Sequence, residues 1–120
     1  MITADALVAY RETARERARR TASLRRQRRE RAWEVARSAA ALLKSRYGAT
    51  RVVAFGSLIE PDRFHLRSDV DLGAWGMSPT DYFEAVARVL DVGGEIKVDL
   101  IQAERCKTFL REALKHGVEL

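Results

Sequence analysis

The first 47 residues carry an apolar pattern of helical period and no helix breaker. Between residues 3 and 47 there is no Gly or Pro, and the strong helix formers Ala, Arg, Glu and Leu predominate. Apolar side chains recur at steps of three and four residues, at Trp33, Ala36, Ala40, Leu43 and Tyr47. This spacing predicts a helix with one face toward a core, and Gly48 is expected to cap its C-terminus.

Upstream the same stripe continues with less apolar material. It is extended by Leu7, Tyr10, Ala14 and Ala18. Residues 19 to 31 contain few apolar side chains. The pattern therefore predicts one long helix, or two collinear helices with a break near residue 20, and an N-terminal part that protrudes from the domain.

Three short runs after residue 48 have the composition or the alternation of half-buried strands. They span Arg51 to Phe55, Asp69 to Trp75, and Glu95 to Ile101. The second run places three apolar side chains on one face, Val70, Leu72 and Ala74, and Asp69 and Asp71 on the other. The third run likewise opposes Ile96, Val98 and Leu100 to Lys97, Asp99 and Ile101. Each strand is thus expected to bury one face.

Two further helices are expected from capping signals and helical spacing. The first begins at Ser78-Pro79-Thr80-Asp81, which offers an N-cap, a proline at the first helical position and an early acid. It is expected to end at Gly93-Gly94, and its buried stripe to consist of Phe83, Val86 and Leu90. The second is expected over about Ala103 to Lys115. Its inward side chains would be Cys106, Phe109, Leu110, Ala113 and Leu114.

Together these elements predict an α+β domain, a small mixed β-sheet with helices on one face, preceded by a long N-terminal helix. Residues 1–47 would form that helix, arginine-rich at 11–31, and residues 48–120 the core. A length of 120 residues suits a single domain.

Composition indicates a soluble globular protein. Apolar residues make up 47% of the chain and charged residues 32%. No apolar run approaches the roughly 18 residues that span a bilayer, and the N-terminus lacks the basic-then-apolar order of a signal peptide. Cys106 is the only cysteine, so it has no partner for a disulfide or a zinc site. A cytoplasmic protein without a membrane partner is expected.

The positive charge is concentrated in one segment. Residues 11–31 hold ten arginines and three glutamates, a local charge of +7 within a net charge of +5. Such a run can be a solvated face, a nucleic-acid footprint or a docking site for an acidic protein. Aromatic residues for base stacking do not interleave with these arginines, and Leu7, Tyr10 and Leu24 could anchor a partner. Docking on an acidic partner is therefore the preferred interpretation.

Carboxylates and a Gly-Ser pair indicate chemistry on the polar face of the sheet. Asp69 and Asp71 point the same way because strand side chains repeat every two residues, and Asp99 lies mid-strand on a polar face. Clustered carboxylates repel one another unless cations neutralise them, and such oxygen ligands suit Mg²⁺. Gly56 and Ser57 leave a strand where backbone N–H groups and a hydroxyl could receive phosphate. A carboxylate cluster beside a phosphate-binding turn is typical of enzymes that transfer phosphoryl or nucleotidyl groups.

These residues resemble the signature of the nucleotidyltransferases of the DNA polymerase β-like superfamily, in particular its minimal, stand-alone members. The signature is Gly-Ser, a spacer, Asp-x-Asp and a third carboxylate on a later strand, here Gly56, Ser57, Asp69, Asp71 and Asp99. The flanking sequences VVAFGS, SDVDL and VDLI are also similar to the family's, and the resemblance covers about residues 33–117. The spacer of eleven residues is slightly longer than in most members.

The resemblance implies ATP as substrate and two Mg²⁺ ions as cofactor. Asp69 and Asp71 would hold both ions, and Asp99 would share one and help to deprotonate the attacking hydroxyl. Gly56 and Ser57 would cradle the terminal phosphates. Many members carry a basic residue and a glycine soon after Gly-Ser, where Ile59, Glu60 and Pro61 stand here. We expect Arg63 or Arg67 to contact the phosphates instead.

The resemblance also implies a partner protein. Minimal members are similar to the antitoxin halves of HEPN–MNT toxin–antitoxin pairs, in which AMP is transferred to a tyrosine of the HEPN ribonuclease toxin. A cognate HEPN-family toxin, held in a hetero-oligomer, is therefore the expected partner. Two alternatives stay open: an inactive antitoxin that neutralises the toxin by binding, and an enzyme that nucleotidylates a small molecule.

Each candidate residue also has an ordinary structural interpretation. Asp69 and Asp71 could be an exposed pair at a turn, and Ser57 could start a helix. Asp99 could pair with a basic neighbour such as Lys97 or Arg51.

Overall fold

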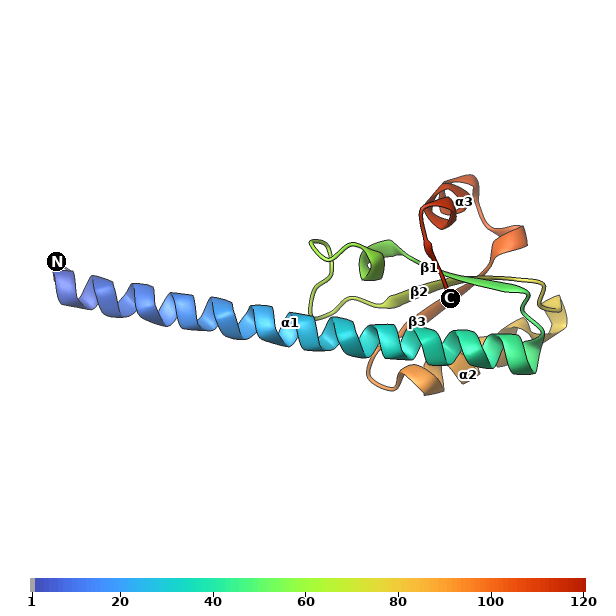
Figure 1. Ribbon diagram of the computed structural model, residues 1–120, viewed down its shortest axis with the longest axis horizontal. Helices are drawn as coiled ribbons and strands as arrows, with labels where there is room; N and C mark the ends of the chain where they lie inside the picture. Colours follow the sequence, from blue (N-terminus) through green and yellow to red (C-terminus); the bar gives the residue numbers. More distant parts are fainter. Residues whose placement is uncertain (1) are drawn as a thin grey trace.

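One uninterrupted helix forms the N-terminal part of the computed structural model, which describes residues 2–120 (Figure 1). Helix α1 spans Ala4–Tyr47; the Thr3 hydroxyl accepts a hydrogen bond from the Ala6 amide at its start. Gly48 caps its end in the left-handed region, at φ 69°, as expected. The alternative of two helices with a break near residue 20 is wrong, because no residue there opposes helix formation.

The sheet is mixed, with the order β3-β2-β1-β4. Its strands are β1 (Arg51–Phe55), β2 (Val70–Trp75), β3 (Val98–Gln102) and the two-residue β4 (Val118–Glu119). Strand β1 pairs antiparallel with β2 and β4, whereas β2 and β3 are parallel. The parallel pair requires a crossover, which helix α2 (Tyr82–Gly93) supplies. The predicted α+β class with a small mixed sheet is confirmed.

Helices α1 and α2 cover one face of the sheet. The main core joins them to the inward side chains of the three longer strands, among them Val52, Ala54, Val70, Leu72, Val98 and Leu100. Helix α3 (Thr108–Lys115) lies against the other face, where Leu114 packs with Val53 and Phe55. The structure thus adds a helix on the second face of the sheet (Figure 1). The polar side chains of β2 and β3 project from that same face.

The predicted stripe of α2 is rotated in the structure, and that of α3 is correct except for one residue. In α2 the buried residues are Ala85, Val89 and Gly93, whereas Phe83 is 82% exposed. Close packing contributes to the difference: a Cβ at residue 93 would lie 3.0 Å from Val98 and 3.7 Å from Val35, so at this position the side toward α1 and β3 has little room for a side chain. Helix α3 begins at Thr108, after a 3₁₀ turn, and leaves Phe109 67% exposed. The other predicted inward residues, Cys106, Leu110, Ala113 and Leu114, pack in the second cluster as expected.

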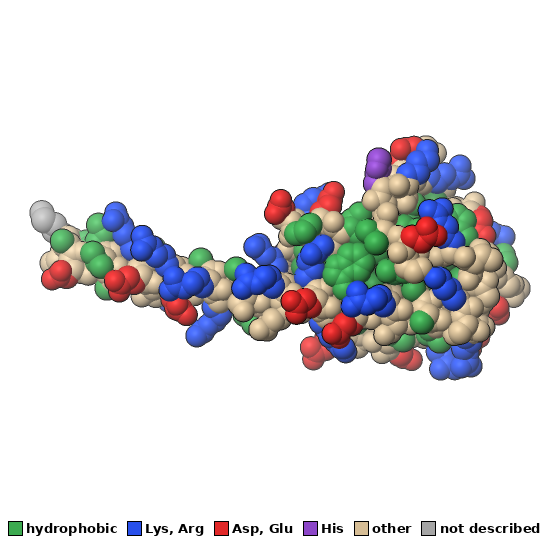
Figure 2. All heavy atoms as spheres, in the orientation of Figure 1, with side chains coloured by type: hydrophobic (Ala, Val, Ile, Leu, Met, Phe, Trp, Pro, Cys, Tyr) green, Lys and Arg blue, Asp and Glu red, His purple; other side chains and the backbone are tan. Residues whose placement is uncertain are grey.

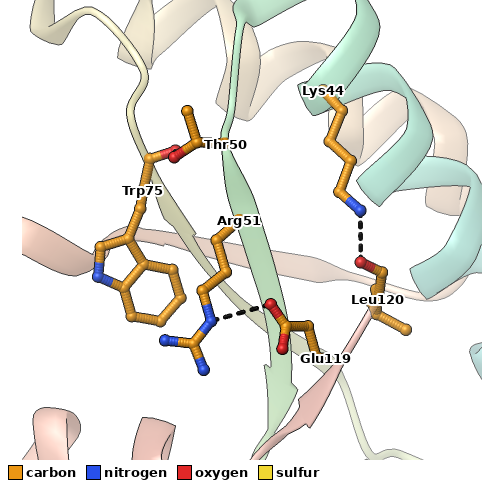
Figure 3. A network of polar contacts seen from close by, with 6 residues as sticks. All are labelled: Lys44, Thr50, Arg51, Trp75, Glu119 and Leu120. Carbon is orange, nitrogen blue, oxygen red and sulfur yellow. Dashed lines mark hydrogen bonds and ion pairs between the residues drawn. The ribbon is translucent and has the colours of Figure 1, made fainter.

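A small polar network connects the start of β1 with β4 and connects the C-terminal residue with α1 (Figure 3). The Arg51 guanidinium lies 4.6 Å from the centroid of the Trp75 ring, and its Nε is 3.1 Å from Glu119 Oε1. Lys44 Nζ donates to the Leu120 carbonyl, which ties the C-terminus to α1. Arg51 is therefore engaged with β4, at the end of β1 opposite to Phe55 and the residues that follow it.

The N-terminal part of α1 projects from the domain and gives the molecule extents of 66 × 28 × 20 Å (Figure 1). Every residue from 2 to 21 is exposed, and the first fully buried side chain of the helix is Ala32. We call residues 4–27 the arm. Over residues 2–120, none of the helices combines the length and the apolar character needed to cross a membrane.

Candidate active site

Two carboxylates lie side by side on the second face of the sheet. Asp71 of β2 and Asp99 of β3 are register partners in the parallel pair, so their side chains project from the same face. Both are half-buried. Their neighbours along each strand, Val70, Leu72, Val98 and Leu100, are buried on the opposite face. The alternation that buries the core therefore also brings these two acids together.

Burial and charge repulsion perturb Asp71. The pKa of its carboxyl is raised from 3.8 to about 6: burial is the largest cause, the charges of Asp99 and Asp69 also raise the pKa, and Lys97 lowers it. Above that pH the half-buried Asp71 carboxylate is ionised close to the carboxylates of Asp99 and Asp69. Such a perturbed carboxyl, held on a rigid strand, is typical of functional sites and is well suited to a cation.

Asp69 stands just before β2 and is half-buried. Its charge reaches Asp71, yet among residues 2–120 no three Asp, Glu, His or Cys side chains lie close enough together to hold a metal ion. Asp99 instead forms an ion pair with Lys97, whose Nζ lies 3.4 Å from Asp99 Oδ1. The structure therefore brings Asp71 and Asp99 together as register partners, with Asp69 near enough for its charge to act on Asp71, but the three acids do not converge on one point. Their carboxylate oxygens remain the ligand type that Mg²⁺ prefers.

The Gly-Ser turn lies directly against Asp71. Phe55 is the register partner of Asp71, and the 3₁₀ helix η1 (Gly56–Ile59) follows it at once. Gly56 has φ 75°, and a Cβ at this position would lie 2.5 Å from Asp71 Oδ2. Only glycine satisfies both the left-handed backbone and this close approach. Ser57 is the second residue of η1 and is half-buried. This position is compatible with starting the helical turn and with binding a phosphate, the two roles expected of it.

The two candidate phosphate-binding arginines differ in their surroundings. Arg63 Nη1 lies 2.8 Å from Glu60 Oε2, so its charge is already paired. Arg67 is exposed two residues before Asp69, and its guanidinium forms no ion pair within residues 2–120. Its backbone amide donates to His65 Nδ1, which fixes the local turn. Arg67 is thus the better placed of the two to receive an incoming anion.

Two arginines of α1 hold the loop that carries these residues, and the sequence pattern did not predict this. Arg28 Nη2 donates to the Ser68 carbonyl at 3.1 Å, and Arg29 Nε donates to the Leu58 carbonyl at 3.0 Å. Both bonds are partly buried, and they secure the two stems of the segment 56–69. The signal was the helical period: counting three and four residues back from Ala32 reaches Arg29 and Arg28, so both belong to the buried face.

The comparisons with known proteins support this assignment of the fold. No protein-family model matches the chain, and neither does any curated protein. A solved structure provisionally named a minimal nucleotidyltransferase is similar over 79% of this chain and 91% of its own, with 27% identity and a TM-score of 0.56. The fold described above is therefore nucleotidyltransferase-like, and a transferase is the kind of enzyme that the similarity supports.

Proposed function

We infer that this chain transfers AMP from ATP to a tyrosine hydroxyl of a partner protein, a HEPN-family toxin, and so acts as its antitoxin. The observation that carries the enzymatic part is the juxtaposition of Asp71 and Asp99 with the Gly56–Ser57 turn in a nucleotidyltransferase-like fold. The partner and the antitoxin role are supported by the resemblance of the sequence to minimal nucleotidyltransferases of toxin–antitoxin pairs.

Each residue of the site has a distinct role in this proposal. The backbone of Gly56, which has no side chain, lets a phosphate approach the turn, and the Ser57 hydroxyl donates to it. Arg67 supplies positive charge from the neighbouring loop. Asp71 and Asp99 would hold Mg²⁺, with Asp69 beside them as a further negative charge, and the ion would neutralise charge on the entering and leaving oxygens of an in-line displacement.

The transfer is balanced in atoms and charge. The tyrosine oxygen bonds to the α-phosphorus of ATP, the bond from that phosphorus to the bridging oxygen breaks, and pyrophosphate leaves. Asp99 is the side chain that accepts the hydroxyl proton, since it is half exposed at the edge of the site and close to the Asp71 carboxylate.

A second candidate function is neutralisation of the toxin by binding alone. One observation favours it: the three acids do not surround a common point, and Asp99 is paired with Lys97. If this were the function, the chain would bind its partner with the same affinity in the presence and absence of ATP and Mg²⁺.

Isotope labelling separates the two functions. With Mg²⁺ and the cognate toxin, ATP labelled in the α-phosphate is expected to leave its label on a toxin tyrosine, located by peptide mass spectrometry. ATP labelled in the γ-phosphate is the control and should leave no label on protein, because that phosphate departs in pyrophosphate. A stable complex with a toxin that stays unlabelled would refute AMP transfer and favour neutralisation by binding.

A further inference from the structure

The arm carries an organised surface that the domain does not use. Four side chains, Leu7, Tyr10, Ala14 and Ala18, continue the buried stripe of α1 beyond the domain. Leu7 is 39% exposed and Tyr10 is 72% exposed. Because α1 is one unbroken helix, these four residues face the same side as the part that packs on the sheet. We call them the docking face.

Charges are sorted around the docking face. Arg11 and Arg15 follow one another at a step of four along one flank, and Arg17 and Arg20 lie on the other. Arg19 continues the first row but turns toward the outer side, where its Nη2 lies 2.8 Å from Glu16 Oε2. The acids of the arm, Asp5, Glu12 and Glu16, lie on the outer side, opposite the docking face. In Figure 2 most basic side chains of the arm follow its upper edge, and the acidic side chains lie along its lower edge. An apolar strip between two positive rows is therefore turned toward the side on which the sheet lies.

This charge pattern selects the kind of partner. A second copy docking through the same face would set arginine rows against arginine rows, which is unfavourable. Nucleic acid would use the arginines and could stack a base on Tyr10, but it would gain little from the aliphatic Leu7, Ala14 and Ala18. We propose that the docking face binds a helix of a partner protein with an apolar stripe flanked by Asp and Glu. The alanines allow close helix packing, Leu7 and Tyr10 supply apolar contact area, and the acidic flanks match the arginines.

The placement of the docking face directs such a partner to the candidate site. From Ala18 to Arg28 the helix advances by about 15 Å. At Arg28 and Arg29 the same face of α1 meets the loop stems at Ser68 and Leu58. A groove of about 420 Å³ opens there, lined on the helix by Arg25, Arg26, Arg29, Glu30 and Trp33 and on the loop by Pro61 and Asp62. A helix on the docking face therefore ends beside the segment that carries Gly56, Ser57 and Asp69. That this brings a hydroxyl to the site rests on the proposed function; the docking itself does not.

The test uses a synthetic helical peptide of about seven turns with leucines along one stripe and glutamates on both flanks. Binding to the full chain is measured by fluorescence anisotropy at several salt concentrations, without ATP. The wild type is expected to bind, more weakly as salt rises. Ala18→Glu should weaken binding about tenfold or more, because it puts a carboxylate into the apolar contact beside acidic flanks. Ala9→Glu, the same change on the outer side of the arm, should leave the dissociation constant within about twofold.

Other outcomes overturn the proposal. Failure of the acidic peptide to bind, or equal binding of a peptide with lysines for the glutamates, would remove the proposed chemistry. Tighter binding of a single-stranded RNA that Ala18→Glu does not affect would make the arm a nucleic-acid surface. A dimer in sedimentation equilibrium that Ala18→Glu dissociates would make a second copy the occupant. None of these measurements uses ATP. A negative result for docking therefore does not decide the labelling test of AMP transfer, and a negative labelling test does not decide the docking proposal.

Discussion

Replacing Asp71 by asparagine is expected to abolish AMP transfer and to stabilise the metal-free protein. The change removes one charge from the centre of the site, where Asp71 touches the Gly56 turn and stands beside Asp99. In the proposed site, loss of a carboxylate that would hold the cation should cost several kcal/mol of transition-state stabilisation, which would lower the transfer rate by about a thousandfold or more.

The stability effect has a definite pH dependence. The folded-state pKa of Asp71 is raised from 3.8 to about 6, so the folded protein binds this proton more tightly than the unfolded chain does. At pH values below 3.8 the carboxyl is neutral in both states and costs nothing; as pH rises toward about 6 the wild type loses stability, and above 6 the loss is complete. After allowance for solvent screening of a half-buried group, the loss is on the order of 1 kcal/mol.

Denaturant unfolding of the wild type and Asp71→Asn, with a chelator present and at several pH values, measures this effect. The variant should be more stable by about 1 kcal/mol above pH 6 and equal to the wild type near pH 3.8. Asp91→Asn, an exposed position on α2, is the matched control and should change neither stability nor transfer. A variant with the activity of the wild type would show that Asp71 is no part of the site.

Replacing Gly56 by alanine is expected to disrupt the site through its backbone. The new methyl group would have to occupy a point 2.5 Å from Asp71 Oδ2, while the residue keeps φ 75°. Either the turn or the carboxylate must move. A loss of about a hundredfold or more in transfer rate is expected, because small displacements of positioned groups have effects of that size, together with about 1–3 kcal/mol of stability.

Gly48→Ala provides a closely matched control for the clash. Gly48 also has positive φ, 69°, but a Cβ there meets no atom within 4 Å. It should therefore share the cost of the left-handed backbone, about 1–2 kcal/mol, and keep full transfer activity. Comparing unfolding free energies and initial rates of the two variants isolates the contact with Asp71. Equal effects of both substitutions on transfer would contradict the geometry described for the Gly56 turn.

Local patterns predicted the three longer strands and the C-terminal ends of the helices well, because these depend on neighbouring residues; they missed β4 and placed the start of α3 too early. The period-two alternation in β2 and β3 placed Asp71 and Asp99 away from the core, and Gly48 ended α1 as expected. The pattern could not give their pairing, since parallel register depends on the crossover through α2. The hydrophobic pattern also wrongly placed Phe83 in the core. The buried face of α2 is instead the one that carries Gly93, where a Cβ would lie close to Val98 of β3 and Val35 of α1.

The motif identified which residues surround the site but not how they are held. Close contact between Gly56 and Asp71 follows from the antiparallel partnership of Phe55 and Asp71, which no local pattern contains. The roles of Arg28 and Arg29 were not predicted, because both lie within the arginine-rich segment and look like its other arginines. Their hydrogen bonds to the loop stems are long-range contacts that exist only in the folded chain. The ion pair of Asp99 with Lys97 was the ordinary interpretation of that acid, and it coexists with the pairing of Asp99 and Asp71.

The most direct test of a Mg²⁺-dependent nucleotide site is calorimetric titration of the full chain with a non-hydrolysable ATP analogue, with Mg²⁺ and with chelator. The account predicts binding that is at least about tenfold tighter with Mg²⁺, and loss of this difference in the double variant Asp71→Asn, Asp99→Asn. An affinity that is the same with Mg²⁺ and with chelator, or a Mg²⁺ effect that survives in the double variant, would contradict it.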